Sequence, residues 1–85
     1  MAVRLVVSIN AAPGKGAEFA RAFRPRCELS RTDLGCQQFE LFQSIENPDK
    51  FALLELWESP EALADHAKQQ AVRPALPEPR TQTIF

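Results

Sequence analysis

The middle of the chain contains the feature that most constrains the fold, a β-hairpin whose strands and turn are all visible in the sequence. Two apolar-rich runs, residues 36–44 and 50–58, flank a short segment whose Asn47-Pro48-Asp49 core is typical of a tight turn. In the second run Phe51, Leu53, Glu55 and Trp57 share one face, and Ala52, Leu54 and Leu56 share the other. Because both faces carry apolar residues, the hairpin needs cover on both sides.

Two more strands are predicted at the ends of the chain. Residues 3–10 are rich in Val, Leu and Ile and stop at a turn around Pro13-Gly14, and a short strand spans residues 80–85. In the first of these, Val3, Leu5, Val7 and Ile9 share a face, while Val6 adds apolar surface to the opposite one. The first strand is therefore expected in the centre of a sheet.

Two helices are predicted between these strands. From Lys15 to about Ser30, apolar residues recur at spacings of three and four, and Pro25 should kink this helix or split it in two. Ser59 is an N-cap that precedes Pro60, and Leu63, His66, Ala67 and Gln70 then line one side of the second helix. The prolines at positions 74, 77 and 79 preclude regular helix beyond it.

The order of elements is β-α-β-β-α-β, which predicts an α+β, ferredoxin-like domain spanning residues 1–85. In this arrangement one antiparallel sheet carries both helices on a single face. The strands nevertheless have apolar side chains on both faces, so the second face needs another protein surface. A second copy of the same chain is the economical choice, and we expect a homodimer.

Composition excludes several classes of protein. With 45% hydrophobic residues, 25% charged residues and a net charge of −1, the chain has no basic footprint for nucleic acid. The apolar start of the chain turns polar by Ser8, too soon for an export signal or a membrane span, so we expect a cytoplasmic protein with no membrane partner. Cys27 and Cys36 are then expected to be reduced and mostly buried.

Four stretches resemble the antibiotic biosynthesis monooxygenase (ABM) family of dimeric α/β-barrel proteins. They are Pro13-Gly14-Lys15 with Phe19 and Phe23, Leu34-Gly35-Cys36 with Phe39-Glu40-Leu41, Asn47 to Phe51 running on to Glu55-Leu56-Trp57-Glu58, and Ala62-Leu63 with His66. The resemblance covers roughly residues 3–70. It implies the dimeric barrel fold and, for the oxygenases of the family, oxidation of a quinol or anthrone by dioxygen without a cofactor.

The sequence departs from the family at three places that bear on function. Phe39 stands where many members have Tyr, which removes a hydroxyl that could orient a substrate. The segment after His66 is shorter and richer in proline than in relatives. Val7 occupies the position of an Asn found in haem-degrading members, which disfavours haem degradation.

His66 is the candidate catalytic base, because it is the only histidine and imidazole titrates near neutral pH. An aromatic surface for a substrate would come from Trp57, Phe51 and Phe39. Polar contacts would come from Ser8, Asn10 or Glu55. This interpretation requires a cavity between the sheet and the helices that reaches His66.

Each of these residues also has a purely structural interpretation. A single histidine on an amphipathic helix is more often packed than catalytic, and aromatic residues of a small domain are core first. Glu55 could form an ion pair with Arg4, Arg24 or Arg31, which we favour over acid catalysis. Ser8 and Asn10 could simply end the strand.

The sequence contains no metal-ligating constellation and no phosphate-binding loop, and it implies no cofactor. The leading prediction is therefore a cofactor-independent monooxygenase that acts on a small aromatic compound of the quinol or anthrone type. The alternative is a non-catalytic dimeric domain that binds a small hydrophobic molecule or has a structural or accessory role. Fold resemblance cannot separate the two.

Overall fold

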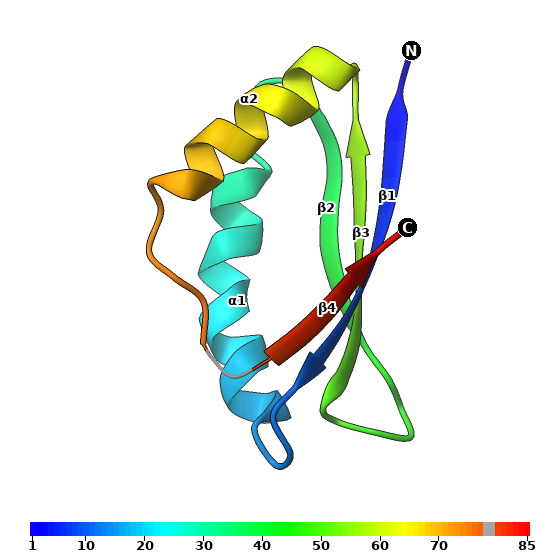
Figure 1. Cartoon of the computed structure of the whole chain (residues 1–85), viewed down its shortest axis with the longest axis vertical. Helices are drawn as coiled ribbons and strands as arrows, with labels where there is room; N and C mark the ends of the chain where they lie inside the picture. The colour runs from blue at the N-terminus through cyan, green and yellow to red at the C-terminus, as the bar shows by residue number, and fades with distance from the viewer. Residues whose placement is uncertain (78–79) are drawn as a thin grey trace.

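A computed structural model describes residues 1–77 and 80–85 and confirms the predicted order of elements (Figure 1). The elements are β1 (Val3–Ala11), α1 (Gly16–Ser30), β2 (Cys36–Gln43), β3 (Lys50–Trp57), α2 (Pro60–Ala71) and β4 (Arg80–Ile84). The four strands form one antiparallel sheet in the order β2-β3-β1-β4, and both helices cover the same face of it. The α+β, ferredoxin-like prediction is thus confirmed.

The predicted hairpin forms with the expected alternation of side chains. Leu41 on β2 and Val7 on β1 both lie opposite Leu53 on the intervening strand β3. Along β3 every second residue, from Phe51 to Trp57, is buried, and the residues between them are half-buried. This pattern shows that one face of the sheet is fully covered by the helices.

The hairpin turn also fixes the start of α1. The carboxylate of Asp49 accepts hydrogen bonds of 2.9 Å from the backbone amides of Gly14 and Gly16. A Cβ atom on residue 16 would lie 1.9 Å from the carbonyl oxygen of Pro48, so only glycine allows this close approach. The turn and the helix start therefore pack as one unit.

Two details of the predicted helices differ from the structure: the split, which was one of the two outcomes predicted at Pro25, and the placement of Ala67. Pro25 does not split α1, which is one continuous helix from Gly16 to Ser30. Pro25 is exposed on the outer side of the helix, where water can satisfy the carbonyl that loses its partner. In α2, Ala67 is exposed because the buried positions, Ala62 and His66, recur every four residues. The helix ends before Pro74, and Pro79 lies outside the described residues.

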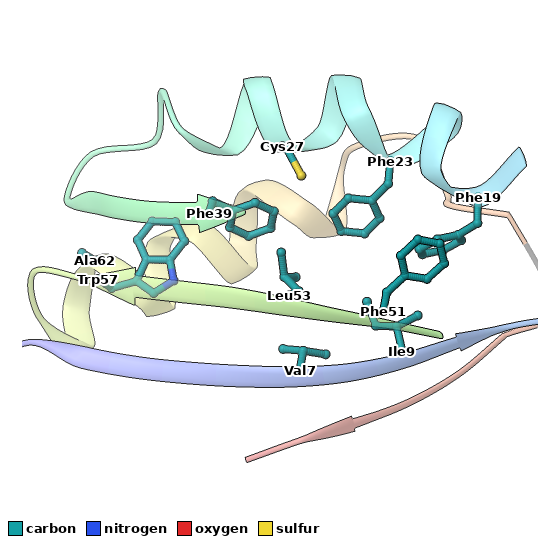
Figure 2. Close-up of a cluster of buried hydrophobic side chains, with 10 residues drawn as sticks. All are labelled: Val7, Ile9, Phe19, Phe23, Cys27, Phe39, Phe51, Leu53, Trp57 and Ala62. Carbon is teal, nitrogen blue, oxygen red and sulfur yellow. The ribbon is translucent and has the colours of Figure 1, made fainter. Parts of the chain in front are cut away.

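The core lies between the sheet and the helices and is dominated by aromatic side chains (Figure 2). Phe19 and Phe23 point from α1 toward the sheet, and their ring centroids are 5.4 Å apart. The ring of Phe19 contacts that of Phe51 on β3, and the ring of Phe23 stacks on that of Phe39 on β2. These contacts continue to Trp57, which is fully buried at the far end of β3.

The opposite face of the sheet, which we call the open face, is apolar and uncovered. Its apolar residues are Val6, Phe42, Ala52, Leu54, Leu56 and Phe85. Phe42 is 45% exposed and Phe85 is 73% exposed. Exposed apolar surface of this kind normally marks a contact with another molecule.

Candidate functional site

His66 lies at the end of the core where α2 crosses the sheet, and the sequence of α2 explains why it is placed there. Ser59 caps the helix by accepting a hydrogen bond of 3.1 Å from the amide of Ala62, and Pro60 occupies the first turn. Ala62 and His66 are four residues apart and so face the sheet together. Only 6% of His66 is exposed.

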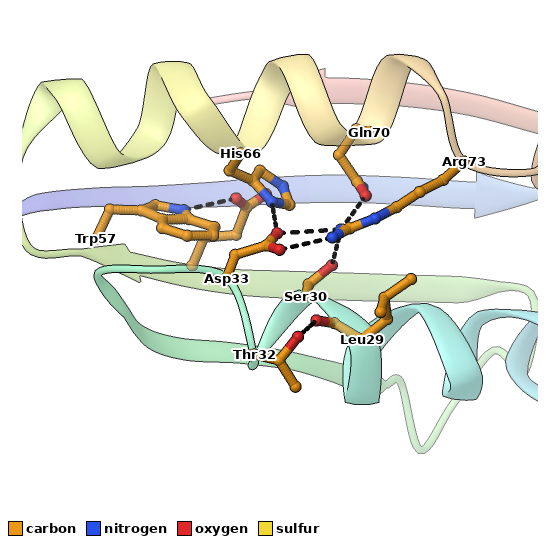
Figure 3. Close-up of polar contacts among 9 residues, drawn as sticks. Leu29, Ser30, Thr32, Asp33, Trp57, His66, Gln70 and Arg73 are labelled. Atoms are coloured by element: carbon orange, nitrogen blue, oxygen red, sulfur yellow. Dashed lines mark hydrogen bonds and ion pairs between the residues drawn. The ribbon is translucent and has the colours of Figure 1, made fainter.

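The imidazole of His66 is hydrogen-bonded to a carboxylate that the sequence did not suggest. Its Nδ1 atom lies 2.7 Å from Oδ2 of Asp33, in the turn between α1 and β2 (Figure 3). An ionised carboxylate has no proton to donate, so it accepts the hydrogen bond and Nδ1 carries the proton. In the neutral imidazole Nε2 is then the nitrogen able to accept a proton.

Arg73, just beyond the end of α2, completes this cluster. Its Nη2 atom donates to Oδ1 of Asp33 at 2.6 Å, and Nη1 donates to Oδ2 at 3.0 Å. The same Nη1 atom lies 2.8 Å from Oε1 of Gln70 and 3.4 Å from Oγ of Ser30. We refer to Ser30, Asp33, His66, Gln70 and Arg73 as the His66 corner.

The charge state of Asp33 follows from these contacts. Burial disfavours a charged carboxylate and by itself would raise its pKa, but the hydrogen bonds from Arg73 and His66, together with their charges, outweigh burial. The pKa of Asp33 is therefore held below its ordinary value of 3.8. At neutral pH the carboxylate is therefore ionised and can accept the hydrogen bond from Nδ1 of His66.

Two of the predicted aromatic residues pack directly on the imidazole. The ring centroids of Trp57 and His66 are 4.3 Å apart, and those of Phe39 and His66 are 5.4 Å apart. The indole Nε1 of Trp57 donates a hydrogen bond of 2.9 Å to Oε1 of the buried Glu55. Among the described residues no arginine pairs with Glu55, so the expected ion pair is wrong and the indole takes its place.

The other three predicted residues lie elsewhere. Phe51 is buried at the opposite end of β3, against Phe19. Ser8 falls between Val7 and Ile9 and so faces the open side of the sheet, where it lines a shallow hollow with Phe42. The exposed Asn10 lies farther along the same side, next to β4. None of the three contacts the His66 corner. Ser8 and Asn10 face the open side of the sheet because side chains alternate along a strand, and Phe51 lies at the far end of β3.

His66 is packed closely by other side chains. Phe39, Trp57 and the Asp33–Arg73 pair pack where the prediction placed a cavity between the sheet and the helices. A pocket of about 610 Å³ lies instead between α1 and the edge strand β2. We call it the α1–β2 pocket, and it is lined by Ala20, Arg24, Cys27, Glu28, Arg31, Glu40, Leu41, Gln43 and Phe51.

Cys27 and Cys36 are free thiols, the first buried and the second half-buried. Burial raises the pKa of both thiols, so they are mainly protonated at neutral pH. Across residues 1–77 and 80–85, no three His, Cys, Asp or Glu side chains are grouped to hold a metal ion. In the same part of the chain, neither helix has the length and apolar character needed to cross a membrane.

Comparison with known protein families identifies the family to which this fold belongs. The sequence model of the antibiotic biosynthesis monooxygenase family matches residues 2–77, most of the chain. The chain belongs to the ABM family. A search of curated proteins found no significant match.

Solved structures agree with this ABM assignment. A putative antibiotic biosynthesis monooxygenase from Nitrosomonas europaea superposes with a TM-score of 0.76 at 24% identity, covering 99% of this chain and 88% of that one. SnoaB, a cofactor-independent oxygenase from Streptomyces nogalater, superposes with a TM-score of 0.75 at 18% identity, covering 99% and 90% of the two chains. At these identities the similarity establishes the shared fold.

Sequence reasoning missed Asp33 and Arg73 in this ABM domain. The two residues are 40 positions apart, and Asp33 lies 33 positions from His66. The only local signal concerned Arg73, which is the one charged residue in a segment otherwise made of apolar residues and prolines, Val72 to Pro77. That signal indicates a buried partner but does not say which one.

Proposed function

We propose that this ABM protein oxidises a small aromatic compound of the quinol or anthrone type with dioxygen, without a cofactor, and that His66 is its general base. The observation that carries the proposal is the 2.7 Å hydrogen bond between Asp33 and His66, beside the aromatic rings of Trp57 and Phe39. A base held in one orientation by a carboxylate is well suited to proton abstraction. The ABM family and the fold shared with SnoaB support the same chemistry.

The reaction needs little from the protein beyond a base and an apolar surface. Loss of a proton from an anthrone gives an electron-rich anion that reacts with dioxygen directly. One oxygen atom then replaces the two hydrogens of the CH₂ carbon as a carbonyl, and the other leaves as water, so no outside reductant is needed. His66 would take the first proton on Nε2, and the surrounding aromatic side chains would exclude water.

This proposal requires a ring to move, because His66 is only 6% exposed. Phe39 and Trp57 pack on the imidazole, so the substrate would have to take the place of part of this contact. Side-chain rearrangement on ligand binding is common even where the backbone stays fixed. The aromatic ring of the substrate would then contact the imidazole in place of Phe39 or Trp57.

Oxygen uptake by the purified protein with a panel of hydroquinones and anthrones tests the proposal. We expect turnover in the wild type and a loss of about 10²- to 10⁴-fold in kcat for His66→Gln, which keeps the size and polarity of the side chain but removes the base. Leu63→Met, on the same helix, is the matched control and should retain activity. Wild-type turnover that survives in His66→Gln would contradict the assignment of the base.

A second candidate, a non-catalytic domain that binds a small hydrophobic molecule, is favoured by the α1–β2 pocket. Its volume of about 610 Å³ suits a drug-sized ligand. Ala20, Leu41 and Phe51 offer apolar contacts, and the charged and polar side chains of the lining could orient polar groups of the ligand. Equilibrium dialysis with the same panel separates the candidates. Binding without oxygen uptake would support this second function, and uptake would support the first.

We also propose that the protein is a homodimer in which two open faces pack together. The support is the row of apolar residues on that face, with Val6, Leu54 and Phe85 adjacent to one another. Val6→Glu would bury a charge in such an interface, and light scattering should show a monomer in place of a dimer. The exposed position of Arg21 makes Arg21→Glu a suitable control, and it should leave the dimer intact.

A further inference from the structure

The contacts of Asp33 form a chain of hydrogen bonds that ends on His66. Arg73 donates one nitrogen to each carboxylate oxygen, at 2.6 Å and 3.0 Å, so the plane of the carboxylate is fixed by two bonds. The oxygen Oδ2 then also accepts from Nδ1 of His66 at 2.7 Å. Neither member of the charged pair is free to reorient, because their side chains are only 11% and 10% exposed.

Arg73 is itself held from both helices. Its Nη1 atom contacts Gln70 in the last turn of α2 and Ser30 at the end of α1. Nearby, Arg26 of α1 donates a hydrogen bond to the backbone carbonyl of Pro74, which ties down the segment that follows Arg73. The guanidinium therefore has one orientation, and it presents its two donors to the carboxylate.

We propose that Arg73 and Asp33 are positioning residues: Arg73 holds the Asp33 carboxylate as an acceptor toward His66, which fixes the imidazole in the Nδ1–H tautomer and leaves Nε2 to accept a proton. The role of Nε2 as a proton acceptor rests on the function proposed above. The fixed tautomer does not, and it can be measured in the protein without any substrate.

Stability alone is a weak explanation for this cluster. A buried ion pair loses about as much in desolvation as it gains in attraction, and apolar residues would join the ends of α1 and α2 as well. A simple cross-link between the helices would also not need the carboxylate to face the imidazole. A histidine whose tautomer is set by a carboxylate behind it is the arrangement found where one ring nitrogen must stay unprotonated.

The chain has a single histidine, so ¹⁵N NMR of the imidazole reports on His66 without assignment. The measurement is made at a pH where titration of each variant shows the ring to be neutral. In the wild type we expect the Nδ1–H form to exceed the Nε2–H form by about tenfold or more, as a charge-assisted hydrogen bond would give. Equal populations in the wild type would overturn the proposal.

Variants of Arg73 test its part. Arg73→Met should release the carboxylate and reduce the tautomer ratio about tenfold, and Arg73→Lys, with one donor group in place of two, should give an intermediate ratio. Arg26→Met is the matched control, because it removes a guanidinium that holds the same segment through Pro74 but does not touch Asp33. A folded Arg73→Met protein with the wild-type ratio, or an equal change in Arg26→Met, would overturn the proposal.

Asp33→Asn tests the carboxylate and provides a second variant if Arg73→Met does not fold. Arg73 should hold the amide oxygen of the asparagine, which turns the amide nitrogen toward His66 as a donor. The imidazole would then present a bare Nδ1 atom, and the Nε2–H form should predominate, a reversal that a purely structural role does not give. Retention of the Nδ1–H form in folded Asp33→Asn would contradict the proposal.

Activity separates this inference from the proposed function. A protein that shows these tautomer changes but no oxygen uptake would retain the positioning roles and lose the oxygenase function. Where uptake is found, Asp33→Asn should lower kcat about tenfold with little change in KM, because reversal of the tautomer leaves only about one-tenth of His66 in the competent form. An unchanged kcat would contradict the role of Nε2.

Discussion

The His66 corner and the α1–β2 pocket divide between them what an active site needs. The corner has an oriented base, with Asp33 2.7 Å from the imidazole, but aromatic rings fill the space beside it. The pocket has about 610 Å³ of space and a mixed lining of apolar and charged side chains, but no histidine. The His66 corner therefore has an oriented histidine enclosed by side chains, whereas the α1–β2 pocket has space for a ligand but no histidine.

The difference shows what the two candidate functions require. Catalysis at His66 depends on movement of Phe39 or Trp57, since the imidazole is otherwise enclosed. Binding in the α1–β2 pocket requires no such movement, because the pocket is already open between α1 and β2. Variants that affect only one region should therefore separate the two functions.

The largest effect on stability should come from breaking the charged pair of the His66 corner. Asp33→Asn leaves the buried Arg73 without a charged partner, and we expect a loss of about 3 kcal/mol in the free energy of unfolding at neutral pH. Urea denaturation measures it. Asp49→Asn, which retains one acceptor oxygen at the start of α1, serves as the control and should cost less.

The same pair predicts how stability changes with pH. The pKa of Asp33 is lower in the folded protein than its ordinary value of 3.8, so the folded state binds fewer protons than the unfolded state in this range. The stabilisation is present above pH 3.8 and is lost as the pH falls through the lower folded pKa. The stability difference between wild type and Asp33→Asn should therefore shrink in acid, and a constant difference would contradict the assignment.

Filling the α1–β2 pocket should have a smaller and more local effect. Ala20→Phe places a ring in the pocket and should weaken binding of a pocket ligand by at least about tenfold, or about 1.4 kcal/mol. Calorimetric titration measures the affinity. The tautomer of His66 should be unchanged, because Ala20 does not contact the His66 corner. Unchanged affinity would place the ligand elsewhere.

The smallest expected effect is on the reactivity of Cys27, which lines the pocket. Burial raises the pKa of this thiol, so its reaction with a thiol reagent should be several-fold slower in the folded protein than in urea. A ligand in the α1–β2 pocket should slow the reaction further. Cys27→Ser isolates the rate of Cys36. Equal rates with and without ligand would argue against occupancy beside Cys27.

Local sequence patterns predicted most of the fold. The Asn47-Pro48-Asp49 turn, the alternation along β3 and the Ser59 cap act over a few residues, and each forms as expected. The helix predictions failed at two positions where the outcome depends on what surrounds the residue in the folded protein. Pro25 is tolerated because it faces solvent, and Ala67 is exposed because the crossing of α2 selects positions four apart.

The candidate site was only half predictable. Trp57, Phe39 and His66 come together because strand and helix periodicity point all three toward the core. Ser8 and Asn10 were drawn from the same strand as Val7 and Ile9, but they occupy alternate positions and face away. Glu55 bonds to an indole rather than to an arginine, a choice that depends on which donor lies nearest in space.

Local patterns in the chain were enough to predict the order of elements, the hairpin turn, the two-sided apolar sheet and the relationship to the ABM family. The meeting of Asp33 and Arg73 at His66, and the position of the α1–β2 pocket, became visible only in the folded protein. The two kinds of feature differ in the distance along the sequence over which the contacts act. Turns and periodicity are set by neighbours in the chain, whereas a carboxylate finds its partners across 33 and 40 residues only when the helices pack.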